Sequence, residues 1–419
     1  MDKILKTLKA LHVSEYRLVE RKTNGKEWFF IGKKLDMSRA KEVTDYYLTI
    51  YQTVYETDKR YKGQATAKIS PQLDEDDLED VICQLVKEAS YVRNPYFDLP
   101  SFMYDIDETF APLGDEQDIF QMMSDFYESD TLSLNSYEFF ETIEEVRIVN
   151  SKGLDVSYIR PTHELELIIN AKSESSEIEY YQDLRFGQAN IADLKHQIGE
   201  ACRQAEERKN AVSTPEMTND VNVILTKENV ISLMRYYLMQ LNTSYIYNKY
   251  SSCEIGTPIG PNYFNIEGIA YLENSSLNHV YDQDGRAVQN VSLIENGIAK
   301  ALWGAHDTSS YLGVDDTTMI YNYKVSGGKV SLDEMKSKPY LELVQFSSFS
   351  CNPITGSFSG EIRLGYYFDG EKTITVTGGS ISGNIKDNEA TMQLSKDLVK
   401  YNNAVVPSAV LLKNVNIAI

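Results

Sequence analysis

The sequence is poor in the residues that bind catalytic metals or form thiol nucleophiles. Its four cysteines, Cys83, Cys202, Cys253 and Cys351, are far apart and form no Cys-x-x-Cys pair. No two of its five histidines lie at the spacing of metal ligands. Phosphate-cradling, dinucleotide-binding and G-x-S-x-G motifs are also missing. These absences exclude the enzyme classes that local motifs identify. A Cys–His pair that meets only in the folded chain stays open.

Long apolar runs and an excess of basic residues are missing as well. No run of about 18 apolar residues occurs, so we expect no membrane-spanning helix. The opening MDKILKTLKALHVSEYRLVERK has no uninterrupted apolar core, so we expect no signal peptide. The 41 Lys and Arg against 62 Asp and Glu give a net charge of −21, which disfavours direct binding of nucleic acid. We therefore predict a cytoplasmic protein with free cysteines that contacts neither nucleic acid nor membrane.

The stretch PTHELELI contains the only His-Glu pair of the chain, His163-Glu164. A zinc-peptidase helix would need a second histidine at position 167 or 168, and Leu167 and Ile168 stand there. Apolar and polar residues alternate from 165 to 171, which is the pattern of a half-buried strand. We interpret His163 as a residue at a strand edge, with Glu164 on the opposite face and no metal role for either.

The length and composition favour a two-domain α+β protein. The 419 residues contain 42% hydrophobic and 11% aromatic residues, enough for a large core. Residues 1–215 mix antiparallel strands with helices, and residues 216–419 are predicted to be mostly antiparallel β, with short apolar runs between turn residues. We place the boundary in the polar stretch STPEMTND, residues 213–220.

Several local signals predict particular elements in the first half. We expect a helix at 3–12, a hairpin with its turn at Asn24-Gly25, and a tight turn at residues 150–153. Acidic residues 74–77 mark the start of another helix, where the helix dipole favours negative charge. A long charged helix is predicted at about residues 190–212.

The second half carries a helix signal and two hairpin signals. Thr226 is the predicted N-cap of a helix whose apolar stripe has the spacing of a core-facing surface. That stripe comprises Val230, Leu233, Met234, Tyr237, Leu238 and Leu241. Asn296-Gly297 and Asp369-Gly370 are the strongest predicted hairpin turns.

Five motifs in order resemble the TldD/PmbA family, also known as modulators of DNA gyrase. They are YKGQATAKI before an acidic helix, RIVNSKGLDVSY, VILTKENVISLM, DQDGRAVQNVSLIENGIAKALW, and TGSFSGEIRLGYYFDGEKTITVTGGSISGN. The resemblance begins near EYRLVERK and extends over most of the chain.

The resemblance implies a function that the spacings alone do not. TldD-type members of the family are zinc peptidases with a His-Glu-x-x-x-His helix in the C-terminal half and a late Cys ligand. They pair with PmbA/TldE-type members that lack these ligands, and the heterodimer encloses a chamber that admits unfolded peptides. This sequence has no His-Glu pair in its C-terminal half and no Cys in YNNAVVPSAVLLKNVNIAI, so it resembles the PmbA/TldE type. The resemblance thus implies a non-catalytic subunit that holds no metal itself, with zinc in a TldD-type partner and unfolded peptide as substrate.

The Gly- and Ser-rich segment 352–360 is our candidate for peptide contact, on its composition and its match to the family. We expect the peptide to add as a strand at a sheet edge, and the candidate residues are Asn352, Gly356, Ser357, Phe358 and Ser359. An ordinary hairpin loop is the alternative interpretation of this segment.

Two other functions stay open at this point. One is a stand-alone homodimeric peptidase of the PmbA family. The other is a non-enzymatic peptide-binding regulator linked to DNA gyrase or to toxin–antitoxin control.

Overall fold

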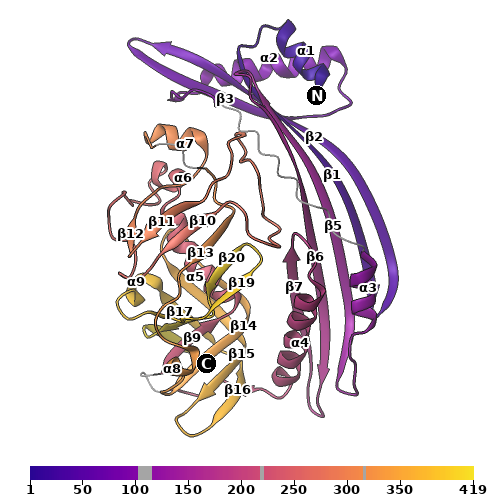
Figure 1. The fold of residues 1–419 in the computed structure, drawn as a ribbon, viewed down its shortest axis with the longest axis vertical. Helices are drawn as coiled ribbons and strands as arrows, with labels where there is room; N and C mark the ends of the chain where they lie inside the picture. The colour runs from indigo at the N-terminus through magenta and orange to yellow at the C-terminus, as the bar shows by residue number, and fades with distance from the viewer. Residues whose placement is uncertain (102–115, 218–220, 315–317) are drawn as a thin grey trace.

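The computed structural model describes residues 1–101, 116–217, 221–314 and 318–419. A long curved antiparallel sheet forms the N-terminal part, and two further sheets with short helices form the C-terminal part, which packs beside it (Figure 1). The predicted α+β class and the mostly antiparallel C-terminal part are confirmed. Within the described residues, no helix is long and apolar enough to cross a membrane.

The N-terminal sheet has seven strands in the order β4-β3-β2-β1-β5-β6-β7. Their bounds are β1 Glu15–Ile31, β2 Lys34–Glu56, β3 Lys59–Ile69, β4 Asn94–Pro95, β5 Leu132–Asn150, β6 Asp155–Lys172 and β7 Glu177–Phe186. The turn at residues 150–153 joins β5 to β6, as predicted, and Gly153 has φ +88°. The predicted turn at Asn24-Gly25 is wrong, because β1 runs through both residues while pairing with β2 on one side and β5 on the other.

Helices cover the two ends of this sheet. α1 (Asp2–Ala10) and α2 (Glu75–Tyr91) share one apolar cluster with β1, β2 and β3. The Asp74 side chain accepts from the Asp77 backbone N–H and caps α2, which confirms the acidic helix start. α3 (Glu116–Ser124) and α4 (Ile191–Arg208) share a second cluster with β5, β6 and β7.

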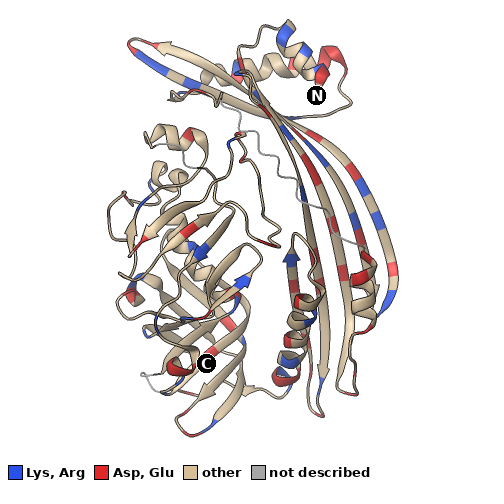
Figure 2. Ribbon diagram, in the orientation of Figure 1, with Lys and Arg blue, Asp and Glu red and all other residues tan. Residues whose placement is uncertain are grey.

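Ion pairs follow the strands between the two helix-covered ends. Lys22 lies 3.9 Å from Glu145 and Lys26 lies 3.1 Å from Glu141, in each case between β1 and β5. Figure 2 shows charged residues of both signs along these strands. Because the lysines of both pairs are exposed and solvent weakens such pairs, we attribute the order of this stretch mainly to its backbone pairing.

The C-terminal part contains a six-stranded sheet and a nine-stranded sheet. The first has the order β12-β11-β10-β13-β20-β19, with bounds Ile298–Ala299, Val291–Glu295, Ile266–Ile269, Asn322–Val325, Ala404–Pro407 and Leu398–Tyr401. The second has the order β18-β21-β9-β14-β15-β16-β8, with bounds Gln393–Leu394, Ala409–Leu412, Asn222–Thr226, Tyr340–Cys351, Ser357–Phe368, Thr373–Thr377 and Val212–Ser213. In addition, β17 (Ser380–Asn384) pairs with β15, and β22 (Val415–Ala418) pairs with β17.

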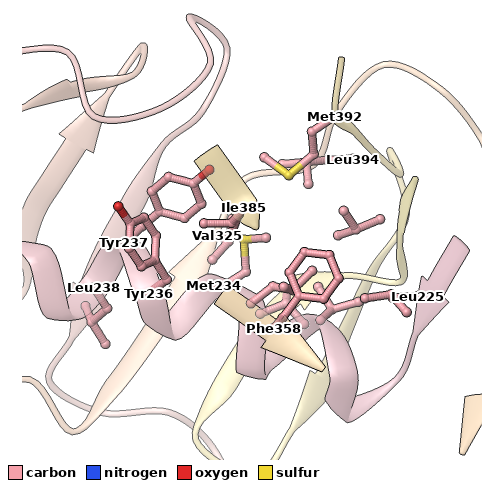
Figure 3. Packing of buried hydrophobic residues seen from close by; sticks show 14 of the residues in the cluster. Leu225, Met234, Tyr236, Tyr237, Leu238, Val325, Phe358, Ile385, Met392 and Leu394 are labelled. Carbon is pink, nitrogen blue, oxygen red and sulfur yellow. The ribbon is translucent and has the colours of Figure 1, made fainter. Parts of the chain in front are cut away.

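Helix α5 (Glu228–Gln240) lies in the core of the C-terminal part. All six residues of the predicted apolar stripe are buried in one cluster, part of which Figure 3 shows. Thr226 is not the N-cap, because it is the last residue of β9 and its Oγ1 donates to the Leu343 carbonyl. Lys227 precedes the helix instead, with φ +60° and no capping side-chain bond.

The remaining helices of the described C-terminal part are short, and its predicted hairpin turns are present. The helices are α6 Thr243–Tyr247, α7 His306–Tyr311, α8 Leu332–Met335 and α9 Ile385–Asn388. Asn296-Gly297 joins β11 to β12, and both residues have positive φ, as a type I′ turn requires. Asp369-Gly370 lies in the turn between β15 and β16.

Buried polar contacts fix the N-terminal sheet against the C-terminal part. Arg17 of β1 forms an ion pair with Asp284. The Arg160 guanidinium donates to Nε2 of His279 over 2.7 Å, so Nδ1 of that ring carries the proton and donates to Tyr158 Oη at 3.1 Å. The division at residues 215/216 stays a prediction. It falls in the link between β8 and β9, where residues 218–220 lie outside the described part of the chain.

Candidate peptide-binding groove

A groove of about 1030 Å³ lies over three neighbouring strands of the nine-stranded sheet. The strands are β15, β17 and β22, paired antiparallel in that order. Its lining residues are Glu216, Met217, Val221, Ser357, Phe358, Ser359, Ser382, Gly383, Asn384, Asp387, Lys413, Asn414, Val415, Asn416, Ile417 and Ile419. Serine and asparagine side chains share the lining with apolar residues, and one basic and two acidic residues complete it.

The groove is hollow because small residues stand side by side on β15 and β17. Ser359 pairs with Ser382, and Phe358 pairs with Gly383. A Cβ on Gly383 would lie 2.5 Å from Phe358 Cζ, so only glycine leaves room for that ring. Phe358 is 2% exposed and belongs to the same core cluster as Met234 and Leu225 (Figure 3). The ring therefore packs into the core, on the opposite face of β15 from Ser357 and Ser359.

Three of the five predicted contact residues, Ser357, Phe358 and Ser359, line the groove. The other two shape the adjoining loop: the Asn352 side chain accepts from the Ile354 and Thr355 backbone N–H groups. Gly356 has φ +76°, and a Cβ there would meet Ile385 at 2.8 Å. Whether any of the five contacts peptide stays a prediction.

An amide network holds the far wall of the groove. Asn388, in α9, has no exposed surface, and its Nδ2 donates to the carbonyls of Asn384 and Asn414. Its Oδ1 accepts from the backbone N–H groups of Lys413 and Asn414. All four bonds of this amide are thus made to backbone atoms, which fixes α9 against the turn before β22.

Strand β22 forms one end of this sheet. It pairs with β17 through Val415 to Ala418, and within the described residues no strand pairs with its other side. Its outward N–H and C=O groups are therefore free for an added strand next to the polar groove.

Several groove residues were not predicted from the sequence. Asn384 could have been predicted, because it is the last residue of the SISGN stretch that resembles the family. Lys413, Asn414 and Asn416 carry no local signal, and only the pairing of β22 with β17 brings them to the groove.

The two residues of the His-Glu pair in the first half have different partners. His163 and Glu164 face opposite sides of β6, as predicted, and Glu164 pairs with Arg185 at 2.7 Å. His163 does not lie at a strand edge, because β6 is between β5 and β7 and the ring stacks with Phe139 and Phe186. Its Nδ1 bonds to the Gly187 carbonyl at 3.0 Å, and burial lowers its pKa.

The other histidines have separate environments. His279 stacks on Tyr321 at 3.8 Å, and burial together with the Arg160 charge lowers its pKa to about 3. His306 Nε2 bonds to the Asp98 carbonyl at 2.7 Å. In the described part of the chain, no three His, Cys, Asp or Glu side chains form a group suited to a metal ion.

Three of the thiols are poor nucleophiles at neutral pH. Burial raises the pKa of Cys202 and of Cys351 to about 11, and it also raises the pKa of Cys253. Since the thiolate is the reactive form, these environments disfavour the Cys–His nucleophile left open by the sequence. Cys83 is exposed on α2.

Comparison with known proteins identifies the family. The profile of the PmbA/TldA metallopeptidase central domain matches residues 108–209, and that of the C-terminal domain matches residues 218–419. An uncharacterized protein of Methanocaldococcus jannaschii is 25% identical over 256 residues, which are 57% of this chain and 59% of that protein. The chain thus spans less than two thirds of that relative's length.

Solved structures share the whole fold. TldE from Thermococcus kodakarensis has a TM-score of 0.77 and 16% identity, over 100% of this chain and 99% of that chain. A candidate modulator of DNA gyrase from Thermotoga maritima has a TM-score of 0.78 and 15% identity, over 99% of both chains. A second such protein, from Bacteroides thetaiotaomicron, has a TM-score of 0.77 and 14% identity, over 100% of this chain and 98% of that chain. Identities this low show the fold alone, but together with the two matching domain profiles they lead to one conclusion: the chain belongs to the PmbA/TldD metallopeptidase family.

Proposed function

We propose that this chain is a metal-free, non-catalytic subunit of a TldD/TldE-like metallopeptidase complex, in which it holds an extended, unfolded peptide. The observation that carries the proposal is the polar groove beside the open edge of β22. A peptide would pair its backbone with β22 and place its side chains over β17 and β15.

The chemistry of the lining supports a peptide of variable sequence. Serine hydroxyls and asparagine amides both donate and accept hydrogen bonds, so they suit any peptide backbone. The few charges, Glu216, Asp387 and Lys413, nearly cancel and select no strongly charged ligand. A complex that degrades unfolded chains needs this tolerance.

The donor set of this chain fits zinc poorly, so we assign the metal to a TldD-type partner. His163 is buried between aromatic rings, and His279 accepts a hydrogen bond from a guanidinium. Binding a cation at Nε2 of His279 would require the Arg160 charge to move away.

Peptide binding by the isolated chain is the first test. Fluorescence anisotropy with a labelled, unstructured peptide should show saturable binding, and Ser382→Trp should weaken it at least about tenfold by filling the groove, a loss of about 1.4 kcal/mol. The matched control, Ser38→Trp, places the same ring at an exposed position of β2 and should leave the affinity unchanged. Equal binding by all three proteins would refute the groove as the site.

Reconstitution tests the assignment as a subunit. Peptide cleavage and zinc content should be measured for this chain alone, for a zinc-bearing TldD-type homologue alone, and for the mixture. We expect cleavage by the mixture only, with zinc in the homologue. Cleavage by this chain alone would favour the stand-alone homodimeric peptidase, and peptide binding without cleavage in any mixture would favour the non-enzymatic regulator.

A further inference from the structure

A second cleft, of about 780 Å³, lies between the N-terminal sheet and the C-terminal part. The β7 residues 177–179 and Tyr181 line one side, and the β14 residues 345–347 line the other. Arg208, the last residue of α4, and Arg363, on β15, both line it. Two cations from different parts of the fold thus meet in one cleft of a chain whose net charge is −21.

Neither arginine has a strong carboxylate partner. The Arg208 Nη1 donates to the Glu179 carbonyl at 3.1 Å, and within the described residues Arg208 forms no ion pair. Arg363 Nη2 lies 3.4 Å from the Glu361 carboxylate, and both side chains are partly exposed. Burial and the nearby Arg363 charge lower the pKa of Arg208, so the two cations repel each other. An anion between them would relieve that repulsion and accept their unused N–H donors.

The backbone of β7 adds a second kind of recognition to the same cleft. β7 ends its sheet and pairs with β6, and no described strand lies on its other side. The Glu179 carbonyl bonds to Arg208, so this carbonyl points away from β6, and the N–H of the same residue points the same way. An extended peptide placed along β7 would therefore find backbone partners next to the two guanidinium groups.

The acidic residues of the cleft narrow the choice of ligand. The side chains of Glu177 and Glu179 are exposed and line the cleft. They would repel a run of acidic side chains but leave room for one carboxylate held by the arginines. We infer that this cleft binds the C-terminal carboxylate of an extended peptide, with the peptide backbone along β7 and the carboxylate between Arg208 and Arg363. The inference rests on the proposed function for the peptide nature of the ligand.

The test compares one unstructured peptide in two forms, with a free C-terminal carboxylate and with a C-terminal amide. Anisotropy titrations of the full chain should give about tenfold tighter binding of the free acid. Arg363→Gln and Arg208→Gln should each reduce that preference to within about twofold. Arg363 is partly exposed, so its substitution leaves the fold intact even if Arg208→Gln does not. The matched control is Arg203→Gln, an exposed position of α4 that should keep the full preference.

The two forms separate this inference from the proposed function. Binding of the amide and its loss in Ser382→Trp test the groove, whereas the ratio of acid to amide affinity tests the cleft. A preference that disappears with Arg363→Gln and survives Arg203→Gln supports the inference. Equal affinity for acid and amide in the unmodified chain, or a preference that both cleft substitutions leave intact, overturns the inference about the cleft. Neither result contradicts the proposed binding groove.

Discussion

Replacing Asn388 by alanine tests the structural basis of the groove. The Asn388 amide makes four hydrogen bonds to backbone atoms of Asn384, Lys413 and Asn414, and it has no contact with solvent. Alanine would leave two carbonyls and two N–H groups without these partners. The wall that carries β22 would then lose its attachment to α9.

The magnitude follows from the number of bonds. A hydrogen bond contributes about 1 kcal/mol net, so four of them give a loss of about 4 kcal/mol. That is a large part of the roughly 5–15 kcal/mol that stabilises a typical domain. Asn388→Asp should not restore the stability, because a carboxylate would face the carbonyls of Asn384 and Asn414 without a proton to donate.

Native-state hydrogen exchange on the amides of β17 and β22 measures the effect where it arises. In Asn388→Ala, the free energy of opening these strands should fall by about 4 kcal/mol. If that free energy is smaller than this in the unmodified chain, protection should be lost completely. Asn416→Ala, an exposed position on β22, is the matched control and should change it by less than about 0.5 kcal/mol. A loss below about 1 kcal/mol in Asn388→Ala would refute the reasoning, because it would show that the four bonds are replaced by water at no cost.

Three further substitutions test other parts of the structure. Arg17→Met should lower the free energy of unfolding in urea by about 3 kcal/mol, since it leaves Asp284 without its cation, and an unchanged midpoint would contradict the interface. Gly383→Ala should lower the free energy of unfolding by about 1–3 kcal/mol, because the new Cβ would overlap Phe358. A single variant as stable as the double variant that also carries a smaller residue at 358 would count against a specific clash. The pKa of His279 is about 3 in the folded chain, below its unfolded value, so its contribution is present above about pH 6.5 and is lost as the pH falls toward 3. In urea titrations, His279→Gln should therefore have a flatter pH dependence than the unmodified chain across that window, by up to about 1.4 kcal/mol per pH unit.

Local signals predicted elements whose causes are local. The acidic helix start at residues 74–77 and the turn at 150–153 depend on neighbouring backbone groups, and both are present. The signal at Asn24-Gly25 failed because β1 lies between β2 and β5, and pairing on both sides extends to Ile31. Thr226 failed as a cap for a similar reason, since its hydroxyl bonds across the sheet to Leu343. In both cases a long-range pairing partner, which no short window contains, determined the outcome.

The residues of the candidate site likewise fall into those that the sequence predicted and those that depend on long-range pairing. The segment 352–360 was predicted from its Gly and Ser content and from its match to the family, and its residues 357–359 line the groove. Asn388 and Asn414 look like ordinary loop or cap residues in the sequence, and their network depends on the order β15-β17-β22. The arginine cleft had no sequence signal, because Arg208 and Arg363 meet only when the N-terminal sheet packs against the C-terminal part.

The groove and the cleft share one physical feature, a terminal strand with an open edge. Such edges invite pairing with any extended chain, including another copy of the protein. β22 is only four residues long, and β7 carries the exposed Glu177 and Glu179. A short edge strand and a charged edge strand both oppose edge-to-edge aggregation. A ligand must therefore gain affinity from something besides the backbone. The amides of the groove and the guanidinium groups of the cleft offer that gain to a flexible peptide, and a folded protein with its strands already paired cannot reach either edge in the same way. Under the proposed function, selection for unfolded chains would follow from the geometry of the two edges rather than from any preferred sequence.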